Sequence, residues 1–407
     1  MGLGLTASSR LKRSLFGLGG YGGDKMLQNL ANEALAYCTS QGIEAVYQGH
    51  VDNKMWYLAF HPAEEPVRFH TDYGEVMVEA RTSSAGPGYH AFVVGFLDHC
   101  QKALGLNWTI DDETGYADSR DFSSLRAAMT EQLRVTAELL HSPDLAGAEN
   151  FALSLPMDFN LTGNYGVASP LGLWDRAFFD NPDAAAWYPW WDYGVTAEAV
   201  HRMALCQLWM NVPWHPARDD DEAKVLVRAS RLAARAAEMG YPLDQEDRAD
   251  LATLMDGQEL AEPGQAGRIG FWRRPRRWLV ADGCSLVMPG YVYRTYRPER
   301  NSLTLVYGER ATHLSTYVTE NADALDALPW PDLSGREEHM RLEADDFRAV
   351  VVLEDTEENG APALALHGFF RGYGRMVLVT VAFRHAGEIP WAEDVMRSVK
   401  LETPAEV

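Results

Sequence analysis

The chain has no long hydrophobic run and no closely spaced cysteines. None of its segments approaches the roughly 20 apolar residues that a membrane-spanning helix needs, so we expect a protein that is not transmembrane. Its four cysteines, at positions 38, 100, 206 and 284, are too far apart for a disulfide framework or a zinc knuckle. We expect reduced, buried thiols and a cytoplasmic protein, with peripheral membrane association left open.

Basic residues are scarce relative to acidic ones. The 36 Lys and Arg residues face 58 Asp and Glu residues, which gives a formal net charge of -22. Such a surface repels nucleic acid and anionic lipid, so general nucleic-acid binding is excluded. Arg greatly outnumbers Lys, a bias typical of GC-rich bacterial genomes, and we therefore expect a bacterial protein.

Recognisable catalytic motifs are also missing. The sequence contains no Gly-x-Ser-x-Gly elbow, His-Glu-x-x-His helix, dinucleotide-binding glycine fingerprint or protein-kinase signature. These absences make an enzyme less favoured without excluding one, and they give no reason to expect a cofactor.

What the sequence does contain predicts a multidomain α+β protein. An apolar fraction of 46% is typical of a packed chain, and 407 residues suggest two or three domains at roughly 150 residues each. We predict a flexible, Gly-rich basic arm over residues 1–24 and an α/β domain over 25–161. A helical region over 162–260 and an antiparallel α+β domain over 268–407 follow, with a linker near 257–267.

Hydrophobic periodicity places the individual elements. A period of 3.6 predicts helices, whereas a period of two predicts strands. The predicted helices cover residues 25–42, 88–104, 121–141, 196–210, 219–239, 244–255 and 390–400, and the strands include 44–49, 55–60, 75–81, 284–288, 303–307, 312–318, 347–353, 363–370 and 375–383.

The last third resembles a known fold. Its features are Ser285-Leu-Val-Met-Pro-Gly290, Thr312-His-Leu-Ser-Thr-Tyr317, Leu366-His-Gly-Phe369, Val379-Thr-Val-Ala-Phe383 and a closing helix with Trp391. Over residues 278–401 this string resembles the PsbP-like α+β fold of DcrB-type lipoproteins and of the chaperones of type VI secretion effectors. The resemblance implies a module that binds other proteins, although, unlike in those lipoproteins, we expect no lipoprotein signal.

An aromatic run is the first candidate binding surface. It comprises Trp187, Tyr188, Trp190, Trp191 and Tyr193. Rings clustered in this way either fill a core or form an interface, where Trp and Tyr dominate the binding energy. Pro189 and Gly194 predict a loop, and we hypothesise that the loop is partly exposed.

An Arg–Trp strip is the second candidate surface. It comprises Trp272, Arg273, Arg274, Arg276 and Arg277, with Arg268 just before it. Guanidinium groups between aromatic rings can bind phosphates or carboxylates, so an anionic ligand or a lipid headgroup could bind at Arg268–Arg277. Pairing with the chain's own acidic helices is the alternative.

A third group of residues has the chemistry of a metal site. His70, Asp72 and His90 carry ligand atoms that suit zinc or iron. The spacing of Glu75 would place that residue on the opposite face of a regular strand, away from His70 and Asp72. We regard a metal-assisted hydrolase as an alternative function.

The sequence as a whole favours a non-catalytic protein that binds a macromolecular partner. The hypothesis is an adaptor, a chaperone or a neutralising component of a secretion or defence system, with another protein as the partner. Recognition of a membrane or lipid headgroup, through residues 1–24 and the Arg–Trp strip, is a second alternative.

Overall fold

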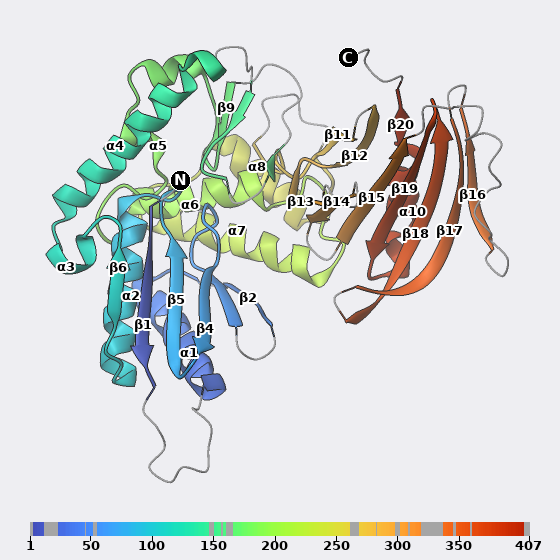
Figure 1. Ribbon diagram of the computed structural model, residues 1–407. Coiled ribbons are helices and arrows are strands. Elements are labelled where there is room, and N and C mark those ends of the chain that lie inside the picture. Colours follow the sequence, from blue (N-terminus) through green and yellow to red (C-terminus); the bar gives the residue numbers. More distant parts are fainter. Residues whose placement is uncertain are drawn as a thin grey trace, which may run out of the picture. The chain divides into compact units, whose positions relative to one another are not determined.

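A computed structural model gives the fold (Figure 1). It describes residues 3–11, 23–44, 46–51, 55–145, 150–155, 158–159, 166–260, 268–281, 283–297, 302–307, 310–318, 337–344, 347–358 and 360–402. The chain divides into two compact units. Unit 1 contains Met1–Pro156 and Gly163–Arg273, and unit 2 contains Met157–Thr162 and Arg274–Val407.

Unit 1 is built on a six-stranded sheet with the order β2-β3-β4-β5-β1-β6, in which neighbouring strands are antiparallel. The strands are β1 (Gly4–Arg10), β2 (Val46–Val51), β3 (Met55–Ala59), β4 (Val67–Asp72), β5 (Glu75–Arg81) and β6 (Thr109–Asp112).

The first strand corrects a prediction. Residues 1–24 were expected to be a flexible arm, but Gly4–Arg10 lies inside the sheet between β5 and β6. Leu5 and Ala7 point into the core while Thr6 between them is exposed, the alternation of a half-buried strand. The basic residues Lys12 and Arg13 lie outside the described residues.

Two helices cover one face of this sheet. The expected helices 25–42 and 88–104 are α1 (Gly23–Gln41) and α2 (Pro87–Leu104). Proline at the first turn of α2 and a left-handed Gly105 at its end are the start and stop signals expected for a helix. Figure 1 shows both helices behind the sheet, and their apolar stripes share its core.

The helical region predicted over 162–260 is part of unit 1, because its apolar residues join the same core as the sheet. That region also contains the strands β9 (Gly166–Ser169) and β10 (Gly172–Trp174), so the prediction of helices alone was wrong. Unit 1 is completed by β7 (Asn150–Ala152), α3 (Tyr116–Ser119), α4 (Phe122–Leu140), α5 (Ala184–Trp187), α6 (Ala197–Met210), α7 (Asp220–Glu238) and α8 (Gln245–Met255).

Unit 2 is an antiparallel α+β domain with other bounds than predicted: it begins at Arg274 rather than at residue 268, and it includes Met157–Thr162, most of which was assigned to the predicted α/β domain. Its large sheet has the order β16-β17-β18-β19-β15-β14-β13-β8, and a small sheet has the order β11-β12-β20. A helix, α10 (Ile389–Arg397), buries Ala392, Val395 and Met396 in this unit's own core. The strands are β8 (Asp158–Phe159), β11 (Pro275–Ala281), β12 (Cys284–Pro289), β13 (Tyr291–Arg297), β14 (Ser302–Tyr307), β15 (Arg310–Val318), β16 (Glu338–Glu343), β17 (Arg348–Glu358), β18 (Ala361–Gly372), β19 (Arg375–Phe383) and β20 (Lys400–Leu401).

The structure therefore confirms a multidomain α+β protein. Within the described ranges, no helix has both the length and the apolar character needed to cross a bilayer. All four cysteines are buried free thiols. Residues 261–267 of the predicted linker lie outside the described residues.

Candidate functional site

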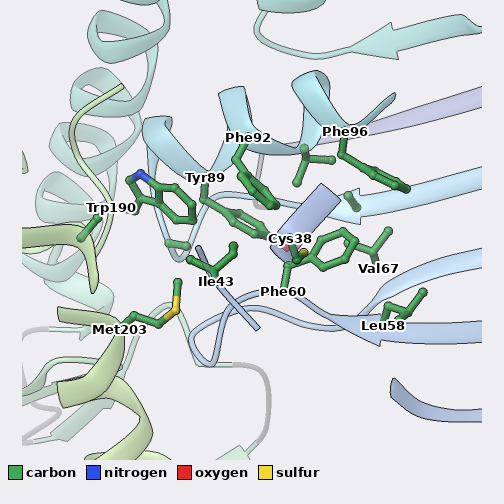
Figure 2. Close-up of a cluster of buried hydrophobic side chains, with 14 of the residues drawn as sticks. Cys38, Ile43, Leu58, Phe60, Val67, Tyr89, Phe92, Phe96, Trp190 and Met203 are labelled. Carbon is green, nitrogen blue, oxygen red and sulfur yellow. The ribbon is translucent and has the colours of Figure 1, made fainter. Parts of the chain in front are cut away.

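The first part of the aromatic run belongs to the core of unit 1. Trp187, Tyr188 and Trp190 are buried, and Figure 2 shows Trp190 among the rings of α2. The ring centroid of Trp190 lies 5.3 Å from that of Phe92. The prediction of an exposed surface was wrong for these three residues. Their large aromatic rings are part of the hydrophobic core of unit 1.

Two glycines at the start of α2, Gly86 and Gly88, leave the space that the aromatic run occupies. A Cβ atom at Gly88 would lie 2.2 Å from the carbonyl oxygen of Asp192, and one at Gly86 would lie 2.6 Å from Cβ of Tyr188. The backbones are joined by hydrogen bonds from Trp190 N–H to the Ala85 carbonyl oxygen (2.8 Å) and from Gly88 N–H to the Trp190 carbonyl oxygen (2.9 Å). Glycine is therefore required where this loop meets the start of α2.

The second part of the run reaches the surface. Trp191 is half-buried and Tyr193 is 67% exposed. We call the group Phe122, Arg126, Trp191, Asp192 and Tyr193 the aromatic patch. Its members come from the first turns of α4 and from the loop before α6.

The aromatic patch is held in place by its own contacts. The Tyr193 ring meets the edge of Phe122 at 5.4 Å, and the Arg126 guanidinium lies 5.0 Å from the Trp191 ring centroid. Arg126 also forms an ion pair with Asp192. Because the guanidinium stacks and pairs at once, it connects α4 to the loop.

The Arg–Trp strip is not one surface. Trp272 and Arg273 belong to unit 1, whereas Arg274, Arg276 and Arg277 belong to unit 2. Trp272 is buried, so its prediction as a surface residue was wrong.

Two of the strip's arginines bind their own chain. Arg273 donates to the Asn211 carbonyl oxygen at 2.9 Å and pairs with Glu222 at 3.4 Å. Arg277 donates to Ser285 Oγ at 3.1 Å and to the Ser398 carbonyl oxygen at 2.9 Å. These contacts agree with self-pairing. Arg274 and Arg276 are half-buried.

The predicted metal set is not brought together. His70 and Asp72 lie on β4, on the face of the sheet opposite to the one that α1 and α2 cover. His90 is buried on α2, where its Nδ1 lies 2.8 Å from Thr82 Oγ1 and its Nε2 lies 3.3 Å from an Asp112 oxygen. Over the described ranges, His, Cys, Asp and Glu side chains form no group of three that could hold a metal. The hydrolase site built on His70, Asp72 and His90 was therefore wrong.

His90 instead helps to hold the loop after β6. Burial raises the pKa of Asp112, but hydrogen bonds from His90 and from the N–H groups of Ala117 and Thr114 outweigh it and hold that pKa well below its usual range. Asp112 thus has a structural role, because it accepts hydrogen bonds from the backbone of the loop that follows it. Arg120, in the same loop, pairs with Asp98 of α2 at 2.9 Å.

A buried polar cluster, which the sequence did not reveal, lies behind the aromatic run. Glu64 accepts hydrogen bonds from the N–H groups of Ser84 (2.6 Å) and Ala85 (2.7 Å), and burial raises its pKa to about 8. Burial also lowers the pKa of His61 to about 3, and the His61 ring lies 5.7 Å from that of Tyr89. The backbone N–H groups just before α2 therefore bind a carboxylate of their own chain.

The face of the six-stranded sheet opposite α1 and α2, which we call the outer face, carries a depression of about 340 Å³. Ion pairs border it, from Arg68 to Glu79 at 3.0 Å and from Arg81 to Glu65 at 3.1 Å. The remaining lining residues include Gly4, Thr6, Asp111 and Glu113. Carboxylates thus outnumber guanidinium groups in this depression.

Comparisons with known proteins identify no family. No family model and no curated protein matches the chain. A crystal structure from Bacteroides thetaiotaomicron VPI-5482 is similar at 12% identity and a TM-score of 0.25, over 31% of this chain. The match spans about half, 49%, of that protein's own length.

Proposed function

We propose that this is a non-catalytic protein that binds a macromolecular partner through the aromatic patch. Tyr193, 67% exposed yet braced against Phe122, is the observation that carries the proposal. Trp, Tyr and Arg are the residues most enriched among interface hot spots, and the patch contains one of each beside Tyr193's ring partner Phe122.

The contacts of the patch favour binding energetically. An interface loses affinity when it must first order mobile side chains, at about 0.5–1.5 kcal/mol for each. Here Arg126 is fixed by Asp192 and by two rings, and Trp191 stacks on the buried Tyr188 at 6.1 Å. The patch therefore presents aromatic area whose ordering is largely complete before the partner arrives.

Charge selects the kind of partner. With a net charge of -22, the protein attracts and orients a basic protein and repels an acidic one. We therefore propose a basic partner protein, with the chain acting as an adaptor, a chaperone or a neutralising component of a bacterial secretion or defence system. The resemblance of residues 278–401 to protein-binding relatives supports the binding role, and the four buried free thiols suit a reducing compartment such as the cytoplasm.

The test compares capture by matched surface variants. The native protein, the double variant Trp191→Ala/Tyr193→Ala and the control Tyr73→Ala are used as baits in a bacterial lysate. Tyr73 is 98% exposed in the turn between β4 and β5, so its removal deletes an aromatic ring without disturbing packing. We expect one basic protein to be recovered by the native bait and the control and lost from the double variant.

Thermal unfolding of the three baits verifies that they are equally folded. Equal recovery of the same protein by all three baits, or no specific protein with the native bait, would contradict the proposed surface.

A further inference from the structure

The outer face of the six-stranded sheet carries a row of soft donor atoms. His70 of β4 lies directly opposite Met55 of β3 on one side and Met77 of β5 on the other. Directly paired residues of antiparallel strands point to the same face, with Cβ atoms about 4.5–5.5 Å apart. The imidazole therefore stands between two thioether side chains, and all three are half-buried.

The neighbouring rows on this face have a different chemistry. On one side Arg68 pairs with Glu79 at 3.0 Å, and on the other Arg10 pairs with Glu75 at 3.3 Å. Those side chains satisfy one another across the strands. The row of Met55, His70 and Met77 contains no such charge pair, and its sulfur and nitrogen atoms are weak hydrogen-bonding partners for each other.

One ring nitrogen of the row has no hydrogen-bond partner among the described residues. Nδ1 of His70 is shielded from solvent, and no atom within the described part of the chain forms a hydrogen bond with it, although a buried ring nitrogen normally has a partner. A bound cation would supply that missing interaction. Tyr57 lies beside the row and donates its hydroxyl to Sδ of Met55 at 2.7 Å, so one thioether is already oriented by a second residue.

We propose that Met55, His70 and Met77 form a binding site for a soft monovalent cation, Cu(I) or Ag(I). Thioether sulfur and neutral imidazole nitrogen are the ligands that select Cu(I), whereas Zn(II), Mg(II) and Ca(II) prefer thiolate, imidazole or oxygen donors. Each sulfur is two bonds from its Cβ atom, so both thioethers can reach a cation held by the imidazole between them. Two sulfurs and one nitrogen complete a three-coordinate site.

This site differs from the hydrolase that His70 and Asp72 suggested. Both thioethers are uncharged and the cation is monovalent, so the site has no means of activating a water molecule as a zinc site does. Its role is to bind and hold the cation. The proposal is independent of the aromatic patch, which uses none of these residues.

Anaerobic titration of the full-length protein with Cu(I), in the presence of the chromophoric chelator bicinchoninate, tests the site. We expect one equivalent to bind in competition with the chelator. Met55→Leu/Met77→Leu, which keeps the apolar volume, and His70→Gln should each weaken binding by about tenfold or more. Met255→Leu is the matched control, because Met255 is 46% exposed on α8 and outside the row. Titration with Ag(I) should reproduce the same order.

X-ray absorption at the copper edge separates this site from the thiols. We expect two sulfur neighbours and one nitrogen neighbour in the native protein, with the sulfur contribution lost in the double methionine variant. Circular dichroism shows whether each variant is folded. Absence of competitive binding, or binding that the double variant retains at native strength, overturns the proposal.

Discussion

Substituting the buried Glu64 should change how the stability of unit 1 depends on pH. Burial raises the pKa of Glu64 from its usual 4.5 to about 8. At about 1.4 kcal/mol for each pKa unit, this interval corresponds to roughly 5 kcal/mol of unfolding free energy. Glu64→Gln keeps an oxygen that can accept from the Ser84 and Ala85 N–H groups, but it cannot ionise.

The direction of the effect follows from proton binding. Because the folded-state pKa is raised, the folded protein holds a proton that the unfolded chain releases above pH 4.5. This contribution to stability is fully present below pH 4.5 and is lost as the pH rises to about 8. His61 acts in the opposite sense, since its pKa is lowered from 6.5 to about 3, and its contribution is lost as the pH falls below 6.5.

The effects of Glu64 and His61 on stability oppose each other between pH 4.5 and 6.5. Above pH 6.5, Glu64 is the one of these two groups whose protonation still changes the unfolding free energy. Between pH 6.5 and 8 the native protein should therefore lose about 2 kcal/mol more of its unfolding free energy than Glu64→Gln does. In the variant, the region below pH 6.5 should show the His61 effect alone, as a steeper loss of stability toward acid.

Urea unfolding at closely spaced pH values, followed by tryptophan fluorescence, measures this difference. Nine of the twelve tryptophans belong to unit 1, so the signal reports mainly on the unit that contains Glu64. Glu65→Gln is the control, because Glu65 is a neighbouring, 39% exposed carboxylate whose charge adds only a minor part to the raised pKa of Glu64, so its substitution should change the profile above pH 6.5 far less than Glu64→Gln does. Parallel profiles for the native protein and Glu64→Gln between pH 6.5 and 8 would refute the reasoning.

Two further predictions concern the contact between α2 and the aromatic run. Gly88→Ala should lower the unfolding free energy of unit 1 by about 2–4 kcal/mol, because the new methyl group would meet the backbone of Asp192. Gly387→Ala, whose new methyl group would have no neighbouring heavy atom within 4 Å, should change stability by less than about 0.5 kcal/mol. Trp190→Ala should cost about 3–5 kcal/mol by leaving a cavity in the core, and Trp191→Ala should cost clearly less. Urea unfolding measures all four, and equal losses for the two glycine variants or for the two tryptophan variants would contradict the packing described.

Periodicity predicted those elements whose apolar residues follow a single regular pattern. Helices 25–42, 88–104 and 121–141 were placed within about two residues of α1, α2 and α4. Strand β1 was missed because Gly4 and the glycines that follow it are typical of a mobile terminus, and its alternation of small residues is weak. Only pairing with β5 and β6, which are distant in sequence, gives these residues a place in the sheet.

The sequence identified residues of the candidate site but not which of them are buried, because burial depends on contacts between distant parts of the chain. The sequence shows that Trp190 and Tyr193 lie in one loop, but it does not show which of the two rings is buried. Burial of Trp190 depends on Gly86 and Gly88, about a hundred residues earlier, which leave room for the loop. The row of Met55, His70 and Met77 was missed for the same reason, because strand register decides which side chains become neighbours.

The aromatic run links the core of unit 1 directly to its proposed partner surface. Hydrogen bonds to Ala85 and Gly88 fix the backbone at Trp190, and Tyr193 follows three residues later. A surface ring attached to a core anchor of this kind keeps its position when the partner is absent, so binding requires little ordering of the loop. The same connection means that a substitution at Gly88 or Trp190 would disturb the patch without touching it. Loss of binding in a core variant is therefore no evidence for contact, and the surface variants at Trp191 and Tyr193 are the informative ones.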